Sequence, residues 1–251
     1  ADAAPLGPLE VAPEGGVEAS VGAAQVDFAN RFLGGGVLTG GCVQEEIRFS
    51  VCPELLAALP LCAAMGENEA IRLHGAERFA TLDGYAFGLA FGGDFRDLTP
   101  RLPDGTVDVT LVAIDALDLR RVPDPDMQFQ PRWLLREANK AFAGFGGARP
   151  PPPVPALVAT GHWGCGAFAG DHALKAVLQW LASSAAGVAL RYHTYGDDRA
   201  GDLDGFTAAA RRRLGTVGAL WSRLVDVAPH APPAGARAAT PWLFDALLRA
   251  A

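Results

Sequence analysis

Residues 27–49 read Asp27-Phe-Ala-Asn-Arg-Phe-Leu-Gly34-Gly-Gly-Val-Leu-Thr-Gly-Gly-Cys-Val-Gln44-Glu-Glu-Ile-Arg-Phe49. Five of the eight residues from 34 to 41 are glycine. Glycine has no Cβ and tolerates positive φ, so we expect the backbone amides of 34–36 to come close to a ligand. The segment 44–59 then has apolar residues at helical spacing. Carboxylates at 45 and 46 suit the positive end of that helix's dipole. A glycine turn that leads into two acids at a helix start is therefore predicted.

An ordinary pair of glutamates is most often the solvated beginning of a helix. Three consecutive glycines, a spacer of seven residues and Gln44-Glu45-Glu46 occur together far less often than any one of these features alone. This combination favours a functional site over a plain helix start.

Composition narrows the class of protein. Half of the 251 residues are apolar and a fifth are charged, which is typical of a globular chain. The net charge of −7 provides no positive field for DNA or RNA, so a polyanionic ligand would have to be held locally by backbone amides and a few arginines. Apolar runs fall short of the roughly 18 residues that cross a membrane. No secretory signal pattern is visible, and we expect a cytoplasmic protein without membrane contact.

The four cysteines give no sign of a metal site. Cys42, Cys52, Cys62 and Cys165 form no C-x-x-C pair and no cluster with zinc-like spacing. We expect small, buried apolar residues in a reducing compartment, with disulfides left open by the sequence. No metal and no cofactor are predicted.

Strand and helix patterns alternate along the chain. The predicted strands are 21–30, 70–74, 85–91, 107–117, 156–160 and 188–195, and the predicted helices are 44–59, 131–145, a helix from 171, 206–225 and 241–250. Residues 1–20 form an irregular lead-in. The proline-rich segment 146–155 is interpreted as a surface loop rather than a domain boundary. This order predicts one α/β domain over residues 1–251, with a sheet sandwiched between helices.

A second glycine loop, Gly161-His-Trp-Gly-Cys-Gly-Ala-Phe-Ala-Gly170, lies between a predicted strand and a helix capped by Asp171. A loop of this kind can bind phosphate, because its amides point inward and the helix N-terminus adds partial positive charge. It is not a Walker loop, and its spacing misses the Rossmann fingerprint by one residue. Alone it is a weak signal.

Both glycine segments resemble those of the poly(ADP-ribose) glycohydrolase family. Two further segments, Thr81-Leu-Asp-Gly-Tyr85-Ala86 and Thr194-Tyr195-Gly-Asp197, also resemble that family, as do 112–117 and 137–142. The resemblance covers roughly residues 20–200. It implies a macrodomain core, a mixed sheet between helices, with added N- and C-terminal segments. One departure is His162, where the family has asparagine.

The resemblance also implies a function. The family hydrolyses ribose–ribose O-glycosidic bonds of poly(ADP-ribose) and releases mainly ADP-ribose. Glu46 would be the general acid and then the base, and Glu45 would hold the leaving ribose. The implied partners are poly(ADP-ribose) and ADP-ribose, with no other nucleic acid, and a monomer is expected. The implied substrate-binding residues are Asp27, Asn30, Gly34, Gly35, Gly36, Gln44, Tyr85 (on the adenine), His162, Gly164, Cys165, Gly166, Ala167, Phe168 and Tyr195 (on a ribose).

Three other interpretations remain open. A non-catalytic ADP-ribose-binding macrodomain would bind without turnover, and the intact Gln44-Glu45-Glu46 counts against it. An unrelated nucleotide-sugar or dinucleotide enzyme would not explain why the other segments match together. A ligand-free scaffold is the third.

Overall fold

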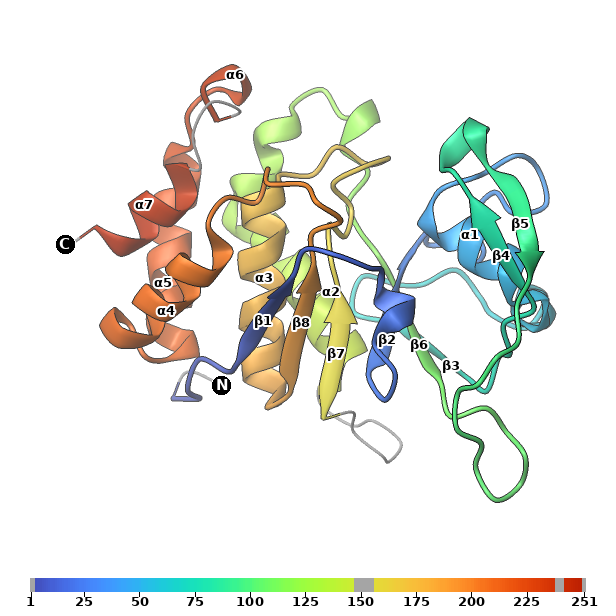
Figure 1. Cartoon of the computed structure of the whole chain (residues 1–251). Coiled ribbons are helices and arrows are strands. Elements are labelled where there is room, and N and C mark those ends of the chain that lie inside the picture. Colours follow the sequence, from blue (N-terminus) through green and yellow to red (C-terminus); the bar gives the residue numbers. More distant parts are fainter. Residues whose placement is uncertain (1–2, 147–155, 238–241, 250–251) are drawn as a thin grey trace.

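A six-stranded mixed sheet forms the centre of the computed structural model, which describes residues 3–146, 156–237 and 242–249 (Figure 1). The strand order is β1-β8-β7-β2-β6-β3. Neighbours from β1 to β6 pair in parallel, and β3 pairs antiparallel to β6. The strands are β1 (Leu9–Ala12), β2 (Ala24–Ala29), β3 (Ile71–His74), β6 (Thr110–Asp115), β7 (Leu157–Thr160) and β8 (Ala189–His193). The predicted α/β class with a mixed sheet is confirmed.

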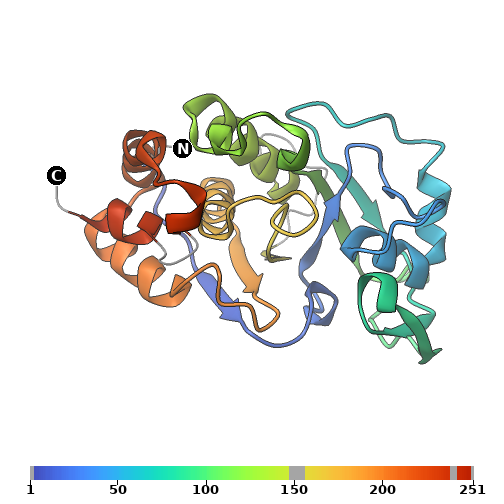
Figure 2. The ribbon, with the colours of Figure 1, turned by 90° about the horizontal axis from the view of Figure 1, so that it is seen from above.

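Helices cover both faces of this sheet. Helices α2 (Pro131–Phe145) and α3 (His172–Ala186) lie side by side on one face (Figure 2). Three further helices, α4 (Leu203–Arg213), α5 (Val217–Val227) and α7 (Trp242–Leu248), pack beyond α3. Helix α1 (Gln44–Val51) lies on the opposite face, beside a separate hairpin of β4 (Ala80–Asp83) and β5 (Ala90–Asp94). The short elements are η1 (Val17–Ala19), η2 (Pro53–Ala58), η3 (Ala86–Gly88), η4 (Leu119–Arg121), η5 (Pro125–Phe129), η6 (Ala228–His230) and α6 (Ala234–Arg237).

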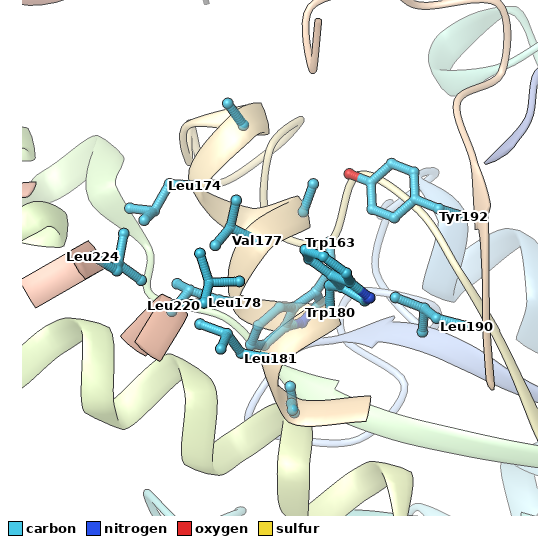
Figure 3. Packing of buried hydrophobic residues seen from close by; sticks show 14 of the residues in the cluster. Trp163, Leu174, Val177, Leu178, Trp180, Leu181, Leu190, Tyr192, Leu220 and Leu224 are labelled. Carbon is cyan, nitrogen blue, oxygen red and sulfur yellow. The ribbon is translucent and has the colours of Figure 1, made fainter. Parts of the chain in front are cut away.

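Strand β6 shows how the sequence separates the two faces. Val112 and Ile114 pack into the larger core with α2 and α3, whereas Leu111 and Ala113 pack into a second core with Phe49 of α1. This alternation follows from the two-residue period of a strand. The larger core is dense around α3, where Trp180 and its neighbours are fully buried (Figure 3).

Several predicted elements are confirmed, and the differences have local causes. Helix α2 has the predicted bounds, and the Asp171 carboxylate caps α3 by accepting from the Leu174 N–H at 2.9 Å. The helix predicted over 44–59 ends at Val51, because Pro53 cannot supply the next N–H and η2 follows. The segment predicted over 206–225 divides at Gly215, which has φ of 73°.

Two predictions about the strands were wrong. The lead-in 1–20 contains β1, an edge strand that is too short for its pattern to stand out. Residues 85–91 do not form one strand, because Ala86 has φ of 52° and begins η3, while a strand in front of the turn, β4, was missed.

The connector at 147–155 lies outside the described residues. Within the part of the chain that the structure describes, no helix combines the length and apolarity needed to cross a bilayer.

The C-terminal helix is part of the packed core. Phe244 of α7 stacks on Phe206 of α4 with ring centroids 4.2 Å apart, and both side chains are buried. We predict that Phe244→Ala lowers the free energy of unfolding by about 3 kcal/mol, because it leaves a cavity beneath the ring. Denaturant titration measures this loss. The control Leu135→Ala removes a half-exposed leucine of α2 and should cost far less; equal costs would contradict the packing.

Candidate active site

The first glycine turn holds the carboxylate of Glu45 with backbone amides. The Gly34 N–H donates to Glu45 Oε1 at 2.7 Å, and the Asn30 N–H donates to Glu45 Oε2 at 2.8 Å. The side chain is only 2% exposed. Glu45 is therefore oriented from two sides by the chain that follows β2.

Glu46 is held in the same way, nearer to the surface. Its Oε1 accepts from the Gly36 N–H at 2.8 Å, and its Oε2 accepts from the Val43 N–H at 3.0 Å, which closes the first turn of α1. The residue is 7% exposed. Two neighbouring carboxyl groups are thus fixed at the N-terminus of one helix, where the helix dipole favours them.

This arrangement corrects the expectation that Gly34, Gly35 and Gly36 offer their amides to a ligand. The amides of Gly34 and Gly36 donate to the two glutamates, and the Gly35 N–H donates to the Phe32 carbonyl at 3.0 Å. No amide of the three remains for a substrate. The turn positions the acids instead.

Gly35 has no room for a side chain. Its φ is 53°, and a Cβ would lie 2.4 Å from Glu46 Oε1 and 2.6 Å from Glu45 Oε2. Both carboxylates would have to move to admit a methyl group. The absence of a Cβ at Gly35 is what lets the two acids converge.

Gln44 joins α1 to the sheet. Strand β2 pairs with β7 only at Ala24 and Gln25, so the next groups on that edge lack a strand partner. Gln44 Oε1 accepts from the Phe28 N–H at 2.8 Å, and its Nε2 donates to the Val26 carbonyl at 3.2 Å. The side chain that we expected on the substrate thus completes the strand. Asn30, expected to fix the sugar, uses its Oδ1 to accept from the Phe32 N–H at 3.0 Å.

Asp27 lies behind the two glutamates, on the sheet face that carries α1. It is 1% exposed, and neither carboxylate oxygen has a hydrogen-bond partner among the described residues. Burial raises the pKa of Asp27 to about 7, opposed by the buried guanidinium of Arg48. Burial likewise raises the pKa of Glu45 to about 9, and the charge of Asp27 adds to this. Together, Asp27 and Glu45 keep a proton near neutral pH. Direct contact of Asp27 with a substrate, as expected from the sequence, is not supported by this burial.

The second glycine loop offers free amides where the first does not. The N–H groups of Gly164, Gly166, Ala167 and Phe168 donate to no acceptor within the described residues. They precede the N-terminus of α3, which adds partial positive charge. Gly164 has φ of 75°, and a Cβ there would lie 2.5 Å from that of Ala116. This loop is suited to an anion.

Two other residues of the loop, His162 and Cys165, make their contacts within the protein. The Cys165 N–H donates to the His162 carbonyl at 3.0 Å and its thiol is buried, so the expected contact of Cys165 with substrate is not supported. His162 Nε2 lies 3.1 Å from the Thr194 carbonyl, and its Nδ1 lies 3.1 Å from the Tyr192 hydroxyl. Burial lowers the pKa of His162. A neutral ring that donates to the carbonyl and accepts from the hydroxyl fits these contacts.

Two tyrosines remain available to a ligand. Tyr85 is 60% exposed at the start of η3, and Tyr195 is exposed with φ of 55°. Partial burial raises the pKa of Tyr85, and the nearby Glu46 carboxylate adds to this. Burial also raises the pKa of Tyr195, with a smaller contribution from Tyr85. Tyr85 therefore lies near Glu46, and Tyr195 lies near Tyr85.

The topology brings the two glycine loops to the same edge of the sheet. They follow β2 and β7, which are parallel neighbours, so both begin at carboxyl ends of strands. A Cβ on Gly161 would lie 3.5 Å from the ring of Phe28 and 2.9 Å from that of Tyr195. The first loop supplies acids, the second supplies amides, and Tyr195 lies beside the second.

Sequence reasoning missed one feature of the site, a cluster of buried charges beneath the second loop. It consists of Asp115, Arg136, Glu137, Lys140 and Lys175. A detectable signal existed, since Glu137 and Lys140 interrupt the otherwise apolar buried face of helix α2. Among the described residues, no group of three or more His, Cys, Asp or Glu side chains could hold a metal ion.

Gly35→Ala tests the convergence of the two acids. We predict that this variant loses at least about a hundredfold of the activity of the site, because a misplaced catalytic group costs about that much. Gly187→Ala is the matched control: its φ of 73° imposes the same backbone strain, but nothing lies within 4 Å and it caps α3 far along the chain. An equal loss of activity in both variants would show that backbone strain, not displacement of the glutamates, causes the loss.

The raised pKa values predict a pH dependence of stability. Folded Asp27 and Glu45 keep protons up to about 7 and about 9, whereas the unfolded chain releases them near 3.8 and 4.5. The stabilisation is thus present at low pH and lost as the pH rises, so the free energy of unfolding falls between about pH 4 and about pH 9. In Glu45→Gln this slope should be shallower in denaturant titrations. The exposed Glu67→Gln should keep the wild-type slope, and an unchanged slope in Glu45→Gln would contradict the assignment.

Comparison with known proteins points to one family. The family described as "Poly (ADP-ribose) glycohydrolase (PARG), Macro domain fold" matches residues 1–202. Poly(ADP-ribose) glycohydrolase 1 of Arabidopsis thaliana is 34% identical over 270 residues, which cover 81% of this chain and 48% of the relative. Probable poly(ADP-ribose) glycohydrolase 2 of the same plant is 33% identical, over 88% of this chain and 49% of the relative. The chain spans about half the length of these two relatives.

Solved structures are more distant. The poly(ADP-ribose) glycohydrolase of Deinococcus radiodurans in complex with ADP-ribose is 18% identical, with a TM-score of 0.43 over 82% of this chain and 84% of that one. That of Thermomonospora curvata, bound to the inhibitor ADP-HPD, is 19% identical, with a TM-score of 0.41 over 75% and 73%. By the match over residues 1–202, the chain belongs to the poly(ADP-ribose) glycohydrolase family, with its macro domain fold.

Proposed function

We propose that this chain hydrolyses the ribose–ribose O-glycosidic bonds of poly(ADP-ribose) and releases ADP-ribose. The observation that carries the proposal is the pair of adjacent carboxyl groups, Glu45 and Glu46, each fixed by two backbone amides and placed at the same sheet edge as a loop with free amides. Membership of the family and the names of the Arabidopsis relatives support it.

Glu46 is the general acid and base of the proposed reaction. It is the more exposed of the two acids, and both its oxygens are oriented by the Gly36 and Val43 amides. Glycoside cleavage needs a proton for the leaving oxygen and a base for the attacking water. The Glu46 carboxylic acid gives its proton to the leaving ribose oxygen as the C–O bond breaks. The resulting carboxylate then takes a proton from the water that adds to the anomeric carbon, which restores the acid.

Glu45 and Asp27 act through Glu46 in this scheme. Adjacent residues of one helix turn are poorly placed to flank a sugar on opposite faces, so the usual scheme of two opposed carboxylates does not apply. The raised pKa of Glu45, caused first by burial and next by Asp27, keeps a proton beside Glu46. Asp27, although buried, therefore belongs to the site as a positioning residue.

The second glycine loop and the two tyrosines bind the ADP-ribose unit. The free amides of Gly164, Gly166, Ala167 and Phe168 would donate to the diphosphate. The exposed ring of Tyr85 would stack on the adenine, a contact worth about 1–3 kcal/mol. Tyr195 would lie against the ribose next to the diphosphate.

Glu46→Gln tests the catalytic role. It keeps the shape of the side chain but removes the transferable proton, so release of ADP-ribose should fall by a factor of at least about 10²–10⁴. Poly(ADP-ribose) is incubated with the protein, and the products are resolved by length. Binding of ADP-ribose, measured by calorimetry, should be retained, because the amides and tyrosines are unchanged.

Two comparisons make this test decisive. The exposed Glu67→Gln controls for the loss of one negative charge and should turn over like wild type. Wild-type turnover by Glu46→Gln would refute the assigned role. Tight binding of ADP-ribose by the wild type without any turnover would instead favour a non-catalytic ADP-ribose-binding macrodomain.

A further inference from the structure

Five charged side chains are gathered beneath the second glycine loop, where α2, α3 and the end of β6 meet. Asp115 Oδ1 lies 2.6 Å from Lys140 Nζ, and its Oδ2 lies 2.6 Å from Arg136 Nη2. The Glu137 carboxylate contacts both Arg136 and Lys175. Glu137, Lys140 and Lys175 are almost completely buried. Charges removed from water in this way are normally balanced by partners.

The cluster contains more positive than negative charge. Two carboxylates face three cations, which leaves one positive charge in excess. Lys140 is fully satisfied, since its Nζ also donates to the carbonyls of Gly66 at 2.5 Å and Glu69 at 2.7 Å. Arg136 contacts Asp115 twice and Glu137 once. Lys175 has Glu137 as its single charged partner among the described residues.

Lys175 lies directly under the second glycine loop. Its Nζ is 4.1 Å from the ring centre of Trp163, which is itself fixed by donating to the Ile114 carbonyl at 2.9 Å. The Nζ is 3.3 Å from the position that a Cβ of Gly164 would take, and the Cε is 3.0 Å from that of Gly170. The loop with the free amides thus rests on the ammonium group of Lys175.

We propose that Lys175 is a positioning residue for diphosphate, whose anion supplies the counter-charge that the buried cluster lacks. The inference rests on the proposed function, because it assigns the diphosphate of ADP-ribose to this loop. Lys175 does not touch the ligand; it acts through the loop, whose glycines bring the anion close to a charge in a medium of low dielectric. The ligand class is an organic diphosphate.

Opposing effects act on the protonation of Lys175. Burial lowers the pKa of Lys175 well below the usual lysine range, and Arg136 adds to the effect. The Glu137 carboxylate in contact with the ammonium favours the charged form, and so would a bound diphosphate.

The test compares two variants on two ligands, ADP and adenosine. Lys175→Met keeps the apolar stem and removes the charge, so Kd for ADP should rise about tenfold while Kd for adenosine stays within about twofold. Glu137→Gln removes the carboxylate that favours the charged form of Lys175, so it should also weaken ADP binding and leave adenosine binding within about twofold. Calorimetry on the full chain gives both constants, and thermal unfolding reports any loss of stability.

The outcomes separate a charge effect from a structural one. Equal losses for ADP and adenosine in either variant would overturn the inference, since a merely structural lysine predicts that result. Hydrolysis of poly(ADP-ribose) by the wild type is followed in parallel. A wild type that binds ADP in a Lys175-dependent way but leaves the polymer intact refutes the proposed function alone. A wild type that hydrolyses the polymer, with unchanged ADP binding in Lys175→Met, refutes this inference alone.

Discussion

The site depends on one constraint, the hydrogen bonds that backbone amides donate to two neighbouring carboxylates. Asn30 and Gly34 hold Glu45, while Gly36 and Val43 hold Glu46. These bonds require a turn that doubles back on the start of α1, and such a turn requires glycine where the acids approach the backbone. The proposed chemistry follows from that geometry. Glu46 lies nearer to the surface, and the deeper Glu45 keeps a proton. The sugar would bind beside them at the edge of the sheet.

Much of the fold could be predicted because its signals are local. The β-branched run of β6 identified a central strand, and a cap such as Asp171 marked the start of a helix. Elements shaped by distant partners were harder to predict. Edge strand β1 exists because β8 pairs with it, 181 residues further along the chain at Leu9 and Leu190. The hairpin of β4 and β5 depends on positive φ at Ala86, which no propensity for alanine predicts.

The sequence identifies candidate residues for the site, but it does not tell which partner each of their polar groups contacts. Glycine spacing marks where a backbone comes close to something, yet it does not say whether that partner is a ligand or the protein. At Gly34 and Gly36 the partners are glutamates of the same chain; at Gly164 the neighbouring amides stay free. The burial of Asp27 follows from the face on which β2 places it. The charges beneath the second loop converge from separate segments, and their sum becomes visible only in three dimensions.

The way Gln44 completes β2 fixes the chemical identity of that position independently of any substrate. The side chain must accept from one main-chain group and donate to another two residues away on the same strand edge. A carboxylate lacks the donor, and the amide of asparagine is one methylene too short. The Gln44 side chain thereby attaches helix α1 to the sheet through the two hydrogen bonds that a neighbouring strand would otherwise make. The orientation of the first turn of α1 is consequently set by the main chain of β2.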